Sequence, residues 1–216
     1  MFKSLGRRLQ VQFATPGAGT SPDGASPAGR PVAPPIDFVA FGDDVILSGS
    51  VPLEGERLTD MLNDHDEYAL SDVVCHGLAD GAGVEVPEFL IRRDELLLVH
   101  ATGPRGNRQR RISTRAVPMV IQIGPYRLHG DLHATPGADA LSQLQRRKPM
   151  IPMTDAWLEF TFGGELQERR LPTIIVNRAR IDWIAPAAHD GFAMLELPRV
   201  RSSHPLVKDF TGNVVG

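Results

Sequence analysis

Two histidines and an aspartate alternate within one stretch that predicts a β-strand. His129, Asp131 and His133 are each separated by a single residue, and alternate side chains of a strand leave the same face of its sheet. Two imidazoles and a carboxylate on one face form a ligand set that zinc or iron accepts. The matching positions of an internal repeat, described below, hold residues of another kind: Ser48, Ser50 and Pro52. A solvent-facing polar stripe fits both segments, so we expect no metal and no cofactor.

Other signs of enzyme chemistry are sparse. The turn at 63–67 (NDHDE) holds three acids and a histidine, but it lacks the ligand spacing and central glycine of a calcium loop. The sequence has no phosphate-binding loop, dinucleotide fingerprint, nucleophile elbow or paired metal-binding cysteines. Its one cysteine, Cys75, fits a small buried hydrophobe. We expect no catalytic residue, and a metal-dependent enzyme remains a third hypothesis.

Five arginines and no acidic residue occupy the segment Thr102 to Ala116. The arginines are Arg105, Arg108, Arg110, Arg111 and Arg115. Guanidinium groups clamp phosphates, carboxylates or anionic lipid heads. No aromatic side chain interleaves them, although stacking on aromatics is what single-strand nucleic-acid binders add. We expect a basic link that contacts an acidic partner, and nucleic acid is the alternative.

The first thirteen residues predict a short basic amphipathic helix. Apolar and basic residues alternate there at helical spacing: Phe2, Leu5, Leu9 and Phe13, with Lys3, Arg7 and Arg8 between them. So short a helix needs a surface to fold on, so these seven residues are the predicted docking site for a membrane or a protein partner. The following stretch, Ala14 to Pro35, contains six prolines and reads as an extended linker.

Composition sets modest limits on the class of protein. The chain has 216 residues, a hydrophobic content of 42%, a charged content of 23% and a net charge of −3, which is ordinary for a globular protein. That charge gives no global attraction to nucleic acid. No apolar run approaches the ~20 residues that cross a bilayer, and no apolar core of a secretory signal follows the basic start. We expect a cytoplasmic protein that can contact the cytoplasmic face of a membrane.

The strongest pattern is an internal repeat. Pairs of matching residues lie 81, 83 and 85 positions apart: Gly49 and Gly130, Asp72 and Asp155, Arg93 and Arg178. So small a drift is what loop insertions leave after an old duplication. Most matched positions are apolar or turn-forming, so the repeat reports on architecture more than on chemistry.

Each repeat predicts strand, strand, short helix and three strands. The predicted strands and helix of the first copy are 38–41, 45–51, helix 56–63, 68–76, 86–92 and 95–101, and those of the second are 117–123, 126–133, helix 139–145, 151–162, 171–177 and 180–184. We therefore predict a mainly β protein made of two small five-stranded barrels or half-sandwiches. The predicted segments are 1–36, N-terminal helix and linker; 37–101, first unit; 102–117, arginine-rich link; 118–186, second unit; and 187–216, an extended C-terminal arm.

The strand order loosely resembles SH3-like and Sm-like barrels. The run Ile175-Val176-Asn177-Arg178 is similar to the Sm signature before the last strand of that family. Ala179 stands where the family has glycine, and the helix follows the second strand instead of preceding the first. We therefore assign the chain to no family.

These patterns favour a non-enzymatic scaffold. We expect an accessory subunit of a larger assembly, peripheral to a membrane or a membrane complex such as a bioenergetic one, with protein subunits as partners. Its terminal arms and arginine-rich link would make the contacts. The alternative is a barrel-type nucleic-acid-binding protein that uses the link.

The arginine-rich link separates these two hypotheses. We predict that the chain binds DNA or RNA no tighter than about 10⁻⁴ to 10⁻⁶ M at physiological salt, the non-specific range. Fluorescence anisotropy over a salt series measures this. A tight complex that weakens steeply with salt, and that is lost when Arg105, Arg108, Arg110 and Arg111 become alanine, would favour the nucleic-acid binder.

Overall fold

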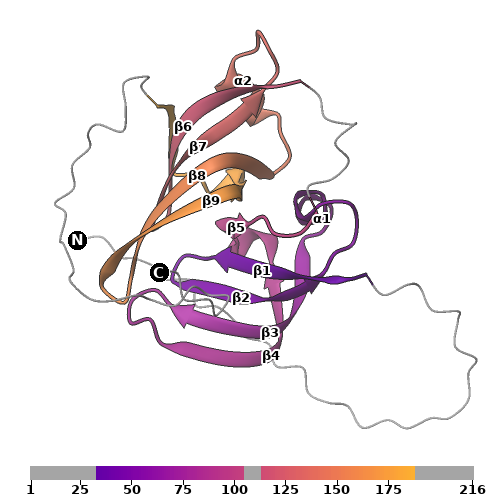
Figure 1. The fold of residues 1–216 in the computed structure, drawn as a ribbon, viewed down its shortest axis with the longest axis vertical. Coiled ribbons are helices and arrows are strands. Elements are labelled where there is room, and N and C mark those ends of the chain that lie inside the picture. Colours follow the sequence, from indigo (N-terminus) through magenta and orange to yellow (C-terminus); the bar gives the residue numbers. More distant parts are fainter. Residues whose placement is uncertain (1–32, 105–112, 188–216) are drawn as a thin grey trace, which may run out of the picture.

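The computed structural model describes residues 33–104 and 113–187 (Figure 1). We call these segments the N-terminal half and the C-terminal half. The predicted N-terminal helix, the C-terminal arm and Arg105, Arg108, Arg110 and Arg111 lie outside the described residues. No helix within the described segments is long and apolar enough to cross a membrane.

The ten strands form one antiparallel sheet in the order β10-β6-β7-β8-β9-β5-β1-β2-β3-β4. The N-terminal half contains β1 (Pro35–Phe41), β2 (Val45–Pro52), α1 (Leu58–Asp64), β3 (Glu67–Gly77), β4 (Gly83–Arg92), the 3-10 turn η1 (Arg93–Glu95) and β5 (Leu98–His100). The C-terminal half contains β6 (Arg115–Ile123), β7 (Tyr126–Ala134), α2 (Ala140–Gln145), β8 (Met150–Phe162), β9 (Glu165–Asn177), the 3-10 turn η3 (Arg178–Arg180) and β10 (Trp183–Pro186).

The prediction of a mainly β protein with two short helices is confirmed, but the sheet is not closed into a barrel. The two sets of five strands are instead joined edge to edge, because β5 of the first half pairs with β9 of the second. Several predicted boundaries were wrong: β4 and β9 begin earlier, at Gly83 and Glu165, and the last strand of each half begins later, after the turns η1 and η3. Strand β1 begins at Pro35, inside the predicted linker, and β6 begins at Arg115, inside the predicted arginine-rich link.

Helices α1 and α2 each follow the second strand of their half and cover an apolar surface. Helix α1 buries Leu58, Met61 and Leu62. Helix α2 begins after Asp139, whose carboxylate accepts a 2.7 Å hydrogen bond from the backbone N–H of Ser142. That hydrogen bond holds the pKa of Asp139 below its ordinary value.

The repeated Gly and Asp positions mark the same irregularity in both halves. Asp72 and Asp155 adopt the left-handed backbone conformation, with φ of 53° and 49°, where the strand register shifts. The bulged strand lies close to the neighbouring backbone: a Cβ on Gly49 would lie 2.9 Å from Ser71 O, and one on Gly130 3.1 Å from Thr154 O. The glycines are therefore required by a close backbone approach beside each bulge.

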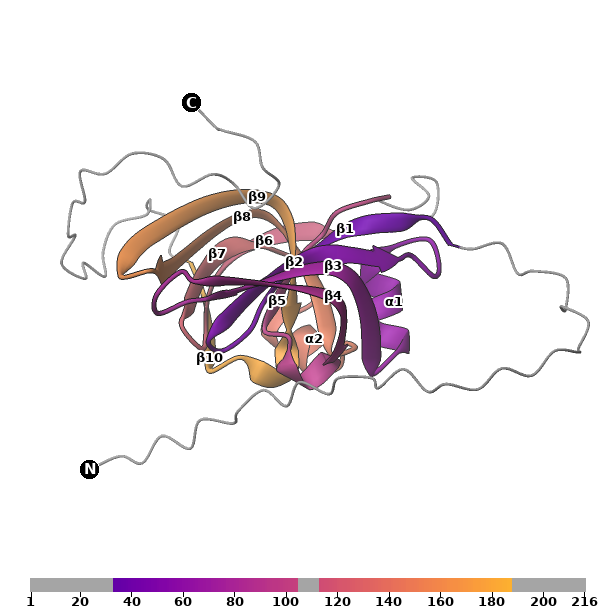
Figure 2. The same ribbon diagram turned by 90° about the horizontal axis from the view of Figure 1, so that it is seen from below.

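The two halves share their hydrophobic core. Phe41 of β1 packs edge-on against Tyr126 and Phe160 of the C-terminal half, with ring centroids 5.5 and 5.9 Å apart. In return, Met150 and Ile175 of the C-terminal half join the core cluster of the first half. Figure 1 shows the two curved sets of strands one above the other, with β5 between them, and Figure 2 shows the same strands from below. Neither half therefore has a complete core of its own.

Tyr68 of β3 bonds α1 to the sheet, and its ionisation makes the free energy of unfolding depend on pH in the alkaline range. Its hydroxyl lies 2.8 Å from Leu62 O and 2.7 Å from His65 O, and burial raises the pKa of Tyr68 to about 12 from 10.0. An unfolded tyrosine ionises near its ordinary pKa while the folded one keeps its proton. The stabilising contribution is thus present below pH 10.0 and is lost as pH rises toward about 12.

We predict that the free energy of unfolding of the native chain falls across this alkaline window, and that Tyr68→Phe weakens the dependence on pH. Urea titrations at several pH values measure both. Burial also raises the pKa of Tyr126, the chain's other tyrosine, so Tyr126→Phe is the matched control and should remove a separate part of the slope. An unchanged slope in Tyr68→Phe would contradict the prediction.

Candidate functional site

The main candidate site is the junction at which the two halves meet. Strand β5 pairs with β9 through Leu98 opposite Val176, Val99 opposite Ile175, and His100 opposite Ile174. Two further backbone hydrogen bonds extend this pairing, from Asn177 N–H to Leu97 O (2.9 Å) and from Ala101 N–H to Thr173 O (3.2 Å). The Leu98, Val99, Ile174, Ile175 and Val176 side chains are fully or almost fully buried. The junction is therefore built like the interior of a single domain.

Asn177 closes one end of this pairing. Apart from the tyrosines, it is the one polar or charged side chain among the described residues that is buried, with 2% exposure. Its Nδ2 donates to Arg93 O (3.0 Å) and Leu96 O (2.9 Å) of the N-terminal half, and its Oδ1 accepts from the Ala179 N–H (3.1 Å). A single amide group thus satisfies the backbone of both 3-10 turns, η1 and η3.

A second amide connects α1 to β8. Asn63 Nδ2 donates to Met150 O (2.8 Å), and Asn63 Oδ1 accepts from Met150 N–H (3.0 Å). Beside it, Lys148 Nζ lies 2.8 Å from Asp64 Oδ1. The hydrogen bond and charge of Lys148 hold the pKa of the Asp64 carboxyl below its ordinary value. Both contacts join α1 to the start of β8, so the helix as well as the sheet spans the junction.

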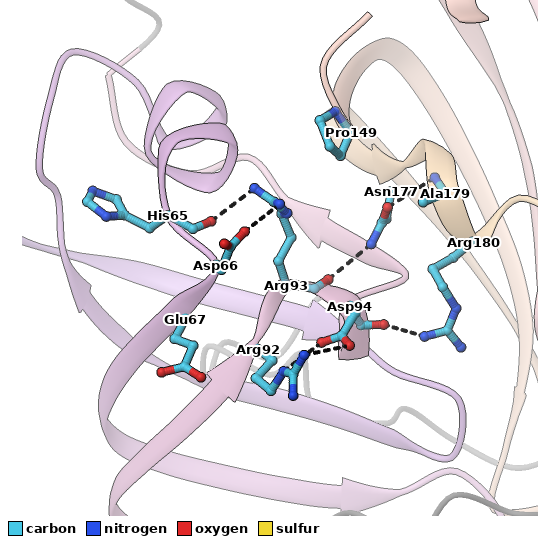
Figure 3. A pocket seen from close by; sticks show the side chains of 10 residues that line it. All are labelled: His65, Asp66, Glu67, Arg92, Arg93, Asp94, Pro149, Asn177, Ala179 and Arg180. Carbon is cyan, nitrogen blue, oxygen red and sulfur yellow. Dashed lines mark hydrogen bonds and ion pairs between the residues drawn. The ribbon is translucent and has the colours of Figure 1, made fainter.

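An open pocket of about 840 Å³ lies over the junction. Its lining comes from the turn before β3, the end of β4 with η1, and the end of β9 with η3: His65, Asp66, Glu67, Arg92, Arg93, Asp94, Pro149, Asn177, Ala179 and Arg180. Figure 3 shows Arg93 turned toward Asp66 and the His65 carbonyl, and Asn177 turned toward the Arg93 carbonyl, whereas the His65 and Glu67 side chains point away.

Each arginine of the pocket is bonded within the chain. Arg93 contacts Asp66 at 2.5 Å and donates to His65 O (3.1 Å). Arg92 contacts the Asp94 carboxylate at 3.1 Å. Arg180 contacts Asp43 at 2.7 Å and donates to Asp94 O (Figure 3). The three cations are thus balanced by carboxylates and backbone carbonyls, and the contacts of Arg180 join the two halves.

The histidine and aspartate stripe lies on β7, away from the pocket. His133 Nε2 lies 2.8 Å from Thr154 Oγ1, and His133 Nδ1 lies 3.2 Å from Thr114 Oγ1. Burial lowers the pKa of His129, and the register shift of β7 against β8 falls between His129 and Asp131. Within the described ranges, no three His, Cys, Asp or Glu side chains gather closely enough to hold a metal ion.

Of the five predicted contact arginines, the structure describes one. Arg115 is the exposed first residue of β6, opposite Ala134. The residues that hold the junction were not predicted to do so: Asn63 was placed in the acidic turn at 63–67, and Asn177 was noted only within a motif. The sequence signal for Asn177 was a polar residue directly after the apolar run Ile174 to Val176.

Comparison of the chain with protein-family models, curated proteins and solved structures finds no match. The function is therefore inferred from the chemistry of the junction and its pocket.

The Asn177 side chain provides a direct test of the junction. We predict that Asn177→Ala lowers the free energy of unfolding by about 1–3 kcal/mol, because the carbonyls of Arg93 and Leu96 each lose a hydrogen bond from the amide. Asn177→Asp keeps the acceptor for Ala179 but removes both donors, and should cost at least as much. Urea unfolding measures the change, with Ser71→Ala, on the exposed part of β3, as the control. A change below ~0.5 kcal/mol for Asn177→Ala would contradict the assigned role.

Proposed function

We propose that the protein is a non-enzymatic scaffold, an accessory subunit whose two halves form one rigid body. The observation that carries this proposal is how the junction uses its polar groups. Asn177, Asn63 and the three pocket arginines all bond to other parts of the same chain. Side chains committed in this way hold a shape and leave little chemistry for a substrate.

We infer further that the halves descend from one duplicated unit. Shifting the first half by 81, 83 or 85 residues reproduces the pairings of the second. Phe41 opposite Ile46 becomes Gln122 opposite Arg127, and Ser48 opposite Val74 becomes His129 opposite Trp157. Glu67 opposite Arg92 becomes Met150 opposite Asn177. Duplication is an economical route to a rigid body with two similar faces, each an open five-stranded unit instead of a closed barrel.

The proposed contacts with partners lie at the ends of the chain. The apolar and basic residues Phe2, Lys3, Leu5, Arg7, Arg8, Leu9 and Phe13 would bind a membrane surface or a subunit of a membrane complex on its cytoplasmic side. Four apolar anchors at roughly 1.5–3 kcal/mol each and about 1 kcal/mol per cation near anionic lipid support weak, reversible binding. The arginine-rich link, with exposed Arg115 at its end, would contact an acidic protein surface.

Deletion of residues 1–32 tests this proposal. The deletion ends before Pro34, whose carbonyl accepts the 3.1 Å hydrogen bond from Leu53 N–H, so the described sheet keeps its contacts. We predict an unchanged melting temperature and loss of co-sedimentation with vesicles that contain phosphatidylserine, or with the native complex in a cell lysate.

A matched pair of full-length variants separates the contributions. Leu5→Ser with Leu9→Ser removes apolar anchors and should release the protein, whereas Gln10→Ser with Gln12→Ser changes the same segment without them. If the shortened chain unfolds at a lower temperature, residues 1–32 belong to the folded body. If it binds as well as the full chain, docking through this segment is wrong.

A further inference from the structure

The sheet of the described chain ends in two open strands. Strand β4 has β3 as its neighbour on one side, and β10 has β6 on one side, so each presents an unpaired edge within the described residues (Figures 1 and 2). An unpaired edge carries a row of free N–H and C=O groups that can pair with another strand.

These two edges are the counterparts of the two strands that meet at the junction. Strand β5 follows η1 and pairs with β1, just as β10 follows η3 and pairs with β6. Strands β9 and β4 both lead into these turns. The junction therefore joins the fifth strand of one half to the fourth strand of the other, while the remaining fourth and fifth strands stay open.

The open edges carry exposed apolar side chains at positions that match buried apolar side chains of the junction. Leu98 and Ile175 are 0% exposed at the junction. Their counterparts, 85 positions away, are Trp183 on β10 and Leu90 on β4, which are 43% and 56% exposed. These two belong to the four exposed large hydrophobic side chains of the described residues, the others being Val84 and Leu166. An exposed apolar side chain on an open strand edge favours pairing of that edge with another strand.

The backbone of β4 and β10 is oriented for the same pairing. On β4, Arg93 N–H donates inward to Asp66 O (2.7 Å), so alternation along the strand directs the N–H and C=O of Leu90 outward. On β10, Ala187 N–H donates inward to Pro118 O (2.9 Å), so those of Ile184 point outward. Pro87 precedes Leu90 by the same three positions that separate Pro172 from Ile175. Three positions reverse the direction of the backbone groups, so the two prolines face β3 and β8, beside the bulges at Asp72 and Asp155, and the pairing edge keeps its N–H groups.

The two open ends of the sheet also carry side chains of opposite charge at matching positions. At the junction, Asn63 at the end of α1 meets Met150 at the start of β8. The residues 83 positions from these two are Arg146, after α2, and Glu67, at the start of β3, and both are exposed. A second interface of the same geometry would bring this arginine near this glutamate.

We propose that β10 of one copy pairs with β4 of the next copy, antiparallel, with Ile184 opposite Leu90 as Val99 is opposite Ile175 at the junction. The partner is a second copy of this chain, because its open β4 edge already has the form that β9 presents to β5. Such an interface is heterologous, so copies join head to tail and form a ring when the rotation between them closes. This proposal rests on the junction geometry and does not depend on the terminal docking segment.

Opposite-edge variants of the full chain test this pairing. Light scattering coupled to size exclusion, between about 1 and 100 µM, gives the mass in solution, a range in which weak interfaces are populated. We expect the native chain to assemble beyond a monomer, and Leu90→Lys and Trp183→Lys each to be monomeric. Leu166→Lys is the control, because Leu166 is exposed on β9 outside the segment that meets β5, and it should assemble like the native chain.

Mixing the two blocked variants tests the direction of pairing. Leu90→Lys keeps an intact β10 edge and Trp183→Lys keeps an intact β4 edge, so the mixture should form a one-to-one dimer that grows no further. Leu90→Pro removes the outward N–H and leaves the bonds to β3, so it tests the edge if Leu90→Lys fails to fold. A monomeric native chain at the highest concentration, a mixture that stays monomeric, or assembly lost in only one of the two lysine variants would overturn the proposal.

Discussion

The pairing of β5 with β9 is the interaction on which the rest of the structure depends. Two units of this size would each be marginal alone, because a small domain leaves much of its apolar surface exposed. Pairing solves this by extending the sheet and by merging the interiors: Phe41 packs against Tyr126 and Phe160, while Ile175 enters the core of the first half. Because successive residues of a strand face opposite sides, three paired positions supply both core clusters at once.

Asn177 shows how a polar group is accommodated at the centre of such a junction. A buried amide is costly unless its donors and acceptor are all bonded, and this one bonds to Arg93 O, Leu96 O and the Ala179 N–H. An apolar residue would pack there but would remove one donor from each of these carbonyls, leaving Arg93 O with the Leu96 N–H (3.2 Å). The amide therefore favours one relative placement of the halves over any other.

The surface chemistry is consistent with a body that holds a shape. The pocket arginines form ion pairs with Asp66, Asp94 and Asp43, and His133 lies beside two threonine hydroxyls instead of facing open solvent with Asp131. By contrast, Leu90 and Trp183 expose apolar area on strand edges. Within residues 33–104 and 113–187, these edges and apolar side chains fit the assembly proposed above.

The sequence by itself determined the elements and their order. Alternation of apolar residues defines the strands because it is a local property of one strand, and the repeat pairs Gly49 with Gly130 and Asp72 with Asp155, at which the structure then placed the bulges. Only the tertiary structure decided that the two units form one sheet. Asn177 bonds to residues 81 and 84 positions away, and every residue carries the backbone groups that pair strand edges, so side-chain pattern does not specify which edges meet. For the same reason Leu90 and Ile175 look alike in sequence, yet one is exposed and the other buried.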